Sequence, residues 1–410
     1  MARTFADSSQ LPRPVVLSSV SLLAQHIPLA LVQKAIAEHG RANQRDRLLP
    51  APFLVYLIVA LSLYMPFALR EVLRCVTEGM RFLGTPAHIA PTLATKGAIS
   101  RARSRLGWEV MKTLCSQVTV PLATPTTRGA WYRGLRLVAL DGTTLAVPAT
   151  PHNIAAFGLP AGQNGAGAFP LVQLAALVEV GTHVIFRVAF DAGSVSEKEL
   201  AMQLLPELGS GMLLLEDRGF VGYHWWKQVR ETKAEIICRL RNNMKFPVVP
   251  PLADGSYLSV LPPPQGAKDQ PIIVRVIRYS LPGVPGTETE YRIITSLLNP
   301  DDAPAREVAA LYHERWEAET TFDEFKTHLR GGALVILRSK TPDLVQQEIY
   351  GLLLAHFVVR SVMHAAALQA DEDPDRISFI HTIRVLRRKL PQAAGIFSPE
   401  EAEAVDAHDY

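Results

Sequence analysis

The sequence has few cysteines and almost no charge imbalance. Its three cysteines, Cys75, Cys115 and Cys238, lie far apart and form no Cys-x-x-Cys pair. This spacing argues against a disulfide framework or a structural zinc site, and it fits a reducing compartment. The 42 basic and 39 acidic residues leave a net charge of +3. The overall charge therefore neither implies nor excludes a nucleic-acid partner, and local patches have to decide.

Common catalytic signatures are also missing. The chain has no P-loop and no Gly-x-Ser-x-Gly elbow, and "GQNGAG" at 162–167 lacks the dinucleotide-binding spacing. His152 and His313 have no second ligand at metal-binding spacing, so we expect structural or surface roles for both. The sequence does not predict a nucleotide hydrolase, an α/β-hydrolase or a dinucleotide enzyme.

One apolar stretch is long enough to span a bilayer. Residues 48–69 carry no charge over 22 positions. Pro50, Pro52 and Pro66 leave only about 13 residues of uninterrupted helix, and core helices of large proteins are also apolar all round. We predict a buried helix, with a membrane protein as the alternative. No secretory signal peptide is visible, so a cytoplasmic location is expected.

The chain changes character near residue 135. Residues 1–118 read as helices, with Gly40 and Gly84 as helix ends. Strand-like runs follow, two of them joined by a hairpin at Gly181-Thr182, and a helix opens with Ser194 and Glu197 at capping-box spacing. The order strand-strand-strand-helix-strand-helix-strand predicts an α/β fold with a mixed sheet and crossover helices.

A proline-rich, β-rich segment interrupts this pattern at about 242–290. One long helix is then predicted over 299–332, ending at Gly331-Gly332, and an apolar helix and a basic stretch follow. We predict a helical N-terminal domain (1–118), a catalytic α/β domain (133–365) and a helical C-terminal tail (366–410). Arg101 and Arg105 share a helix face in the first domain, which suits either phosphate contact or solvation.

Four polar residues form a stripe on the predicted long helix. At 100° per residue, Tyr312, Arg315, Glu319 and Lys326 fall within roughly 60° of its circumference. Arg315 and Glu319 alone could be an ordinary surface pair, which is worth about 0.2–0.5 kcal/mol. The Arg315–Glu319 pair indicates a functional site only if other acidic residues lie close to it.

Two further carboxylates follow apolar strands. Asp141 ends "LVAL" and Asp217 ends "MLLLE", and α/β sheets place their chemistry at such strand ends. The simpler alternatives are an Asp-Gly turn at Asp141 and a loop acid paired with Arg218 at Asp217. If Asp141, Asp217 and Glu319 converge, cations must lie between them, and Mg²⁺ is the natural choice for oxygen ligands.

These motifs resemble those of bacterial insertion-element DDE transposases of the insertion sequence four family. That family carries a Tyr-(2)-Arg-(3)-Glu-(6)-Lys signature, which Tyr312, Arg315, Glu319 and Lys326 match without a gap. "LDGTTL" and "DRGF" resemble the blocks that hold the family's two aspartates. The β-rich insertion between the second aspartate and Glu319, which are 102 positions apart, resembles the family's interrupted RNase H-like domain.

The resemblance implies cut-and-paste transposition on the element's own terminal inverted repeats. It implies that Asp141, Asp217 and Glu319 bind divalent ions, expected to be two Mg²⁺ with Mn²⁺ as a substitute. The expected partner is double-stranded DNA, including terminal repeats and target, held by a homodimer in a synaptic complex. Tyr312, Arg315 and Lys326 are expected to grip the DNA backbone. Trp316 is expected to stack on a base, or else to pack.

Two other carboxylates are alternative metal ligands, and one alternative function also remains. Glu216 precedes Asp217 but should point to the opposite face of its strand. Asp323, one turn after Glu319, could pair with Lys326. A decayed or repurposed relative that binds DNA without cutting it is the alternative function.

Overall fold

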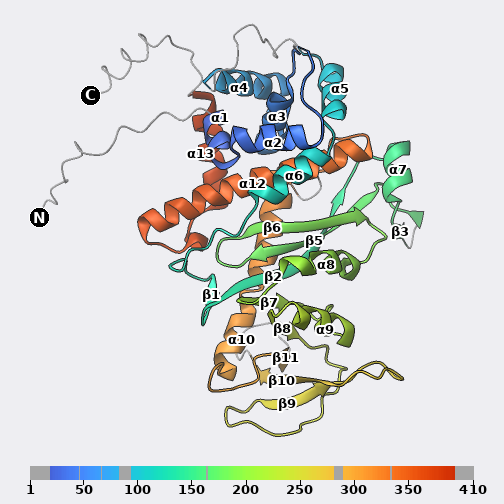
Figure 1. Ribbon diagram of the computed structural model, residues 1–410, viewed down its shortest axis with the longest axis vertical. Helices are drawn as coiled ribbons and strands as arrows, with labels where there is room; N and C mark the ends of the chain where they lie inside the picture. Colours follow the sequence, from blue (N-terminus) through green and yellow to red (C-terminus); the bar gives the residue numbers. More distant parts are fainter. Residues whose placement is uncertain are drawn as a thin grey trace, which may run out of the picture.

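A mixed β-sheet forms the centre of the protein in the computed structural model (Figure 1). The structure describes residues 19–392, apart from positions 46, 66, 83–93, 163–164, 281–289 and 333–334. The strand order is β6-β5-β2-β7-β8-β11-β10-β9, with β1 paired to β2, and β3 and β4 form a small separate ladder. The strands are β1 Trp131–Tyr132, β2 Leu135–Ala146, β3 Ala161–Gly162, β4 Gly165–Ala166, β5 Leu171–Glu179, β6 Val184–Ala192, β7 Met212–Glu216, β8 Glu235–Arg239, β9 Tyr257–Leu261, β10 Ile272–Tyr279 and β11 Tyr291–Thr295.

The first five long strands give the RNase H-like arrangement. β2, β5 and β6 form an antiparallel meander, and β7 and then β8 are added in parallel on the other side of β2. This topology confirms the predicted fold class. The hairpin between β5 and β6 lies at Gly181-Thr182, where Gly181 has a φ of 82°. A Cβ there would lie 2.7 Å from the amide nitrogen of Ala130, so the turn requires glycine.

The β-rich insertion continues the same sheet. β11 pairs antiparallel with β8, and β10 and β9 follow outward. In Figure 1 these strands extend the sheet away from the N-terminal helices. The insertion at about 242–290 was predicted as a β-rich segment. The structure adds that its strands β9 and β10 extend the central sheet, with β11, which follows the insertion, covering the edge of β8.

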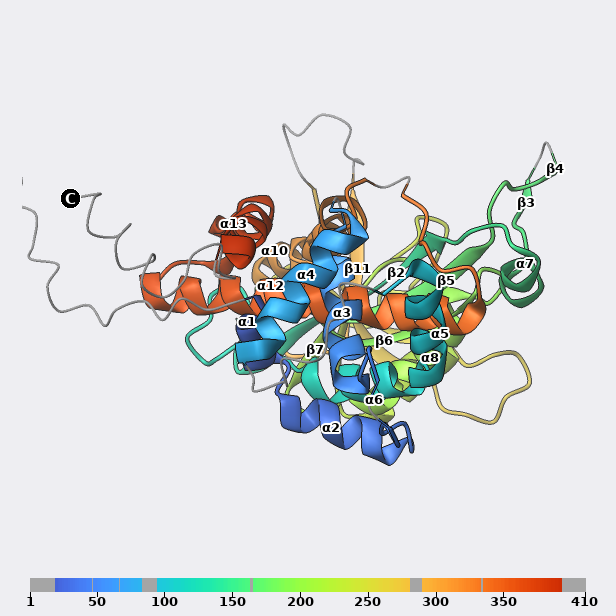
Figure 2. The ribbon, with the colours of Figure 1, turned by 90° about the horizontal axis from the view of Figure 1, so that it is seen from above.

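Helices cover the sheet and form a layer at one end of it (Figures 1 and 2). They are α1 Ser19–His26, α2 Leu29–Glu38, α3 Ala51–Leu63, α4 Leu69–Phe82, α5 Lys96–Leu106, α6 Glu109–Val118, α7 Pro151–Phe157, α8 Glu197–Leu204, α9 Tyr223–Glu231, α10 Ala305–His313, α11 Trp316–Asp323, the π-helical turn η3 Glu324–Leu329, α12 Pro342–Ala370 and α13 Phe379–Gln392. The helix end expected at Gly40 has a φ of 62°, whereas the end expected at Gly84 lies outside the described residues.

Helix α12 joins the N-terminal helices to the sheet. It packs against α3, α6 and β6, and it crosses α3 closely at Gly351. A Cβ at Gly351 would lie 2.7 Å from Ile58 Cγ2 and 3.2 Å from the Ile58 carbonyl oxygen. Arg387 of α13 donates a 2.7 Å hydrogen bond to the carbonyl oxygen of Leu63. The N-terminal and C-terminal helices therefore share one packed layer.

The apolar stretch forms the buried 13-residue helix α3, as predicted. Within the described residues, α12 alone is long and apolar enough to cross a membrane, and 78% of its apolar window is buried inside the protein. Both helices therefore pack as core helices do.

Two local predictions were wrong. The single helix over 299–332 is divided into α10, α11 and η3, with a turn at Glu314-Arg315 where i→i+3 hydrogen bonds replace the α-helical ladder. The capping box of α8 uses Ser196 and Glu199 instead of Ser194 and Glu197. Ser196 Oγ accepts from the Glu199 amide, and the Glu199 carboxylate accepts from the Ser196 amide.

Candidate active site

Asp141 and Asp217 lie on neighbouring strands where the strands separate. β2 pairs with β7 only as far as Ala139, and β2 then continues beside β5 through Asp141 and Gly142. Asp141 is therefore a strand residue, and the alternative of an Asp-Gly turn is wrong. Its Oδ1 accepts a 2.8 Å hydrogen bond from the Gly142 amide. Asp217 directly follows β7, and its Oδ1 accepts a 2.6 Å bond from the Gly219 amide.

Arg315 links Glu319 to Asp141. Helix α11 packs on β2, and Arg315 Nη2 donates a 2.6 Å hydrogen bond to Glu319 Oε1. Arg315 Nη1 lies 3.6 Å from Asp141 Oδ2. Because Arg315 is only 8% exposed, this is not the solvated surface pair considered above. This contact places the helix that carries the Tyr-Arg-Glu-Lys signature next to strand β2, which carries Asp141.

The pKa of Asp141 depends on both of the other predicted acids. Burial raises the pKa of Asp141, the Gly142 amide and Arg315 lower it, and Glu319 and Asp217 raise it further. Asp141 therefore interacts with both other carboxylates. Arg315 contacts both Asp141 and Glu319, and Asp217 lies near enough to act on Asp141.

The other members of the signature differ in accessibility. Lys326 is half-buried, its Nζ donates a 2.7 Å hydrogen bond to Thr143 Oγ1, and burial lowers its pKa. Tyr312 is only 5% exposed, and burial raises its pKa. Trp316 is 56% exposed, with the Arg315 guanidinium 5.5 Å from its ring centroid.

The rival carboxylates have other partners. Glu216 is fully buried and accepts a 2.7 Å hydrogen bond from Trp225 Nε1, and burial raises its pKa. Asp323 Oδ2 lies 3.1 Å from His328 Nε2, whereas Lys326 bonds to Thr143. Among the described residues, Asp323 and Lys326 form no direct ion pair, although Asp323 raises the pKa of Lys326 against the effect of burial. The π-helical turn that begins at Glu324 gives this segment a different geometry from the α-helix assumed in the prediction.

Sequence reasoning missed a fourth carboxylate, Glu197. It is half-buried at the first position of α8. Burial, followed by Asp141 and Asp217, raises its pKa to about 7. Because its spacing from Ser194 fitted a capping box, Glu197 was interpreted as a capping residue and not as a neighbour of the other acids.

Basic residues line two separate hollows, one at Asp217 and one among the N-terminal helices. Asp217 opens onto a hollow of about 560 Å³, lined also by Arg218, Gly219, Arg241, Asn242 and Asn243. Among the described residues, Asp217 forms no ion pair with Arg218, so the simpler alternative for Asp217 is not supported. Arg101 and Arg105 are exposed on α5. Arg105 lines a second hollow, of about 250 Å³, together with Arg41 and Arg47.

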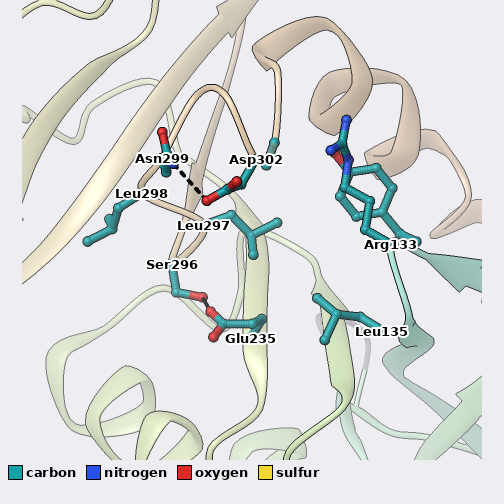
Figure 3. A pocket seen from close by; sticks show the side chains of 10 residues that line it. Arg133, Leu135, Glu235, Ser296, Leu297, Leu298, Asn299 and Asp302 are labelled. Carbon is teal, nitrogen blue, oxygen red and sulfur yellow. Dashed lines mark hydrogen bonds between the residues drawn. The ribbon is translucent and has the colours of Figure 1, made fainter.

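A third hollow, of about 520 Å³, lies away from the acids (Figure 3). Leu135 and Glu235, which line it, begin β2 and β8, whereas Asp141 lies in the middle of β2 and Asp217 directly follows β7. Glu235 accepts a hydrogen bond from Ser296, and Asn299 donates one to Asp302. We assign this hollow to the packing of the loop that follows β11 against β1, β2 and β8.

An ionic cluster anchors the other side of α11. His183 Nε2 lies 3.0 Å from Asp375 Oδ1 and 3.4 Å from Glu317 Oε2. Donor atoms of these three residues lie close enough to hold a metal ion. However, the Arg360 guanidinium lies against His183 Nδ1 and donates to Glu324, so a cationic side chain already lies among these acids. Burial and Arg360 lower the pKa of His183, but the hydrogen bonds to Asp375, Glu317 and Glu324 raise it to about 10.

Comparison with known proteins defines the class. Residues 132–358 match the family model described as "Transposase DDE domain", and residues 17–116 match "Insertion element 4 transposase N-terminal". The protein is a DNA transposase. The chain belongs to the DDE transposase family, and the second match agrees with the insertion sequence four group that the motifs indicated. Members of this family cleave and transfer DNA strands and use divalent metal ions.

Two sequence relatives agree with this assignment. The transposase InsG for insertion sequence element IS4 of Escherichia coli K12 is 29% identical over 91% of this chain and 83% of its own length. The putative transposase InsZ of the same strain is 25% identical, over 53% of this chain and 68% of its own. The solved synaptic complex of piggyBac transposase with hairpin DNA has a TM-score of 0.49 at 11% identity, covering 96% of this chain and 85% of that one.

Proposed function

We propose that this transposase cuts and rejoins DNA at the terminal inverted repeats of its own insertion element, with Asp141, Asp217 and Glu319 as ligands of divalent ions. The observation that carries the proposal is the position of Arg315, whose guanidinium lies between Asp141 and Glu319. These acids attract a cation, and their oxygens are the ligand type that Mg²⁺ prefers. Two Mg²⁺ ions are proposed, with Mn²⁺ able to replace them.

The chemistry is an in-line displacement at phosphorus. A water or 3′-hydroxyl oxygen forms a new bond to phosphorus as the bond to the leaving oxygen breaks, and the leaving oxygen takes up a proton. The bound ions would lower the pKa of the attacking hydroxyl and stabilise the leaving oxygen. Asp141, Asp217 and Glu319 would hold those ions in place against the scissile phosphate.

Other residues are proposed to hold the DNA. Lys326 and Arg315 would contact phosphates next to the carboxylates. Trp316 has the exposed ring that stacking on a displaced base requires. Tyr312 is buried behind Arg315, so we propose that it contributes by supporting that side chain.

The remaining parts of the chain are proposed to bind and pair the element ends. The helical region 1–118 would bind DNA, with Arg101 and Arg105 contacting phosphates, and residues 133–365 would form the catalytic domain. We propose that a homodimer holds two ends in the synaptic complex, and that the protein works in the bacterial cytoplasm on nucleoid DNA.

The test is cleavage of a labelled duplex that carries the element's terminal repeats. We expect cutting at the repeat ends with Mg²⁺ and none with EDTA. Glu319→Gln should bind this DNA without cutting it, and Asp323→Asn, one turn along, should still cut. Binding without cutting by the unmodified protein, with either Mg²⁺ or Mn²⁺, would favour a non-catalytic DNA-binding relative instead.

A further inference from the structure

Glu197 does not cap helix α8, because Ser196 and Glu199 form the capping box. Ser196 and Glu199 satisfy the first turn of α8, and Glu197 follows the cap directly. Within the described part of the chain, no hydrogen bond or ion pair is formed by its carboxylate. A half-buried carboxylate in this position lacks the compensation that buried charges usually have.

The Glu197 side chain lies directly on the backbone next to Asp141. A Cβ placed on Gly142 would lie 2.4 Å from Glu197 Oε1 and 2.5 Å from its carboxyl carbon. Glycine inside a strand commonly marks such a close approach. Gly142 therefore provides the space in which the Glu197 carboxylate sits, adjacent to Asp141.

We propose that Glu197 is a fourth carboxylate ligand of the metal centre, facing Asp141 and Asp217 from helix α8. The inference rests on the proposed function, because it assumes that Asp141, Asp217 and Glu319 hold the metal. With Glu197 included, acids from β2, the end of β7 and two helices surround the site, and the Arg315 guanidinium is the cation that acts on Glu197. Four carboxylates supply enough oxygen ligands to hold two hard divalent ions while leaving positions for water and phosphate.

The test measures Mn²⁺ binding to the full-length protein by electron paramagnetic resonance, without any cleavage step. We expect Glu197→Gln to weaken Mn²⁺ binding by about tenfold or more, whereas Glu231→Gln, an exposed acid on α9, should leave it unchanged. Because Glu197 is uncompensated, Glu197→Gln should also raise the melting temperature in EDTA. A purely structural role would lower that temperature.

Gly142→Ala tests the position of the Glu197 carboxylate in a second way. The new methyl group would displace the flexible Glu197 carboxylate, so Mn²⁺ binding should weaken as in Glu197→Gln. Adding Gly142→Ala to Glu197→Ala should cause no further loss. A further loss of similar size would show that the methyl group acts on Asp141 instead, and would overturn this reading of Gly142 and Glu197.

Glu319→Gln separates the two proposals. If Glu319→Gln weakens Mn²⁺ binding and Glu197→Gln does not, the role of Glu197 is overturned and the proposed function stands. If neither change affects Mn²⁺ binding, the proposed metal centre itself is overturned.

Discussion

Lys326 Nζ donates a 2.7 Å hydrogen bond to Thr143 Oγ1, two residues beyond Asp141 on the same strand. The last member of the helix signature is thus connected to the strand that carries the first carboxylate. The proposed function uses this cation to contact a phosphate next to the scissile bond.

Lys326→Gln should weaken binding to terminal-repeat DNA and reduce its salt dependence. Loss of one phosphate contact should change the slope of log Kd against log salt concentration by about 1. Lys233→Gln, an exposed lysine just before β8, should leave the slope unchanged. An unaltered slope in Lys326→Gln would refute the phosphate contact.

Arg315→Ala should destabilise the metal-free protein by about 1–3 kcal/mol, because Asp141 and Glu319 lose the cation between them. Mg²⁺ should then raise the melting temperature more than it does in the unmodified protein. Arg133→Ala breaks a surface pair with Glu307 and should cost at most about 1 kcal/mol, with no change in the response to Mg²⁺. Equal stability of Arg315→Ala and the unmodified protein in EDTA would contradict the bridging role.

Trp316→Ala should impair end cleavage without unfolding the protein. Loss of base stacking is worth about 1–3 kcal/mol, so cleavage should fall by about 5- to 150-fold. The exposed ring leaves no cavity when it is removed, so the melting temperature should be nearly unchanged. Trp226→Ala, in contrast, empties a fully buried site and should cost about 3–5 kcal/mol. Normal cleavage by Trp316→Ala would exclude stacking.

His183 should make the stability of the protein fall at alkaline pH. Its pKa of about 10 in the folded protein lies above the ordinary value of 6.5. Its contribution to the free energy of unfolding is therefore fully present below about pH 6.5 and is lost as the pH rises through about 10. His183→Gln should cost about 3 kcal/mol at pH 6 and should lose stability less steeply between pH 7 and 10. Chemical denaturation across this range measures both effects, with the exposed His152→Gln as control. Parallel curves for His183→Gln and the unmodified protein would contradict the assignment.

Much of the fold could be predicted from local patterns. Apolar runs ending in Asp141 and Asp217 located β2 and β7, and Gly181-Thr182 located the hairpin, because strand burial and turn geometry depend on neighbouring residues. The pairing of β11 with β8, which joins the insertion to the central sheet, could not be predicted in this way, since it depends on contacts between residues far apart in the sequence.

The site was predicted less completely, for two physical reasons. Residues three and four apart share a face both in one long helix and in two helices joined by a tight turn. The sequence pattern therefore did not indicate the break at Arg315. Glu197 had an adequate local explanation as a capping residue. Its approach to Gly142 exists only once α8 folds back near β2.

The most direct test of the proposed metal centre replaces one ligand with sulfur. Asp217→Cys should fail to cut terminal-repeat DNA with Mg²⁺, which binds thiolate poorly, and should regain cutting with the more thiophilic Mn²⁺. Asp217→Ala should fail with both ions. Cutting by Asp217→Cys with Mg²⁺ at the unmodified rate, or equal recovery of Asp217→Ala with Mn²⁺, would contradict direct ligation by Asp217 and with it the central claim.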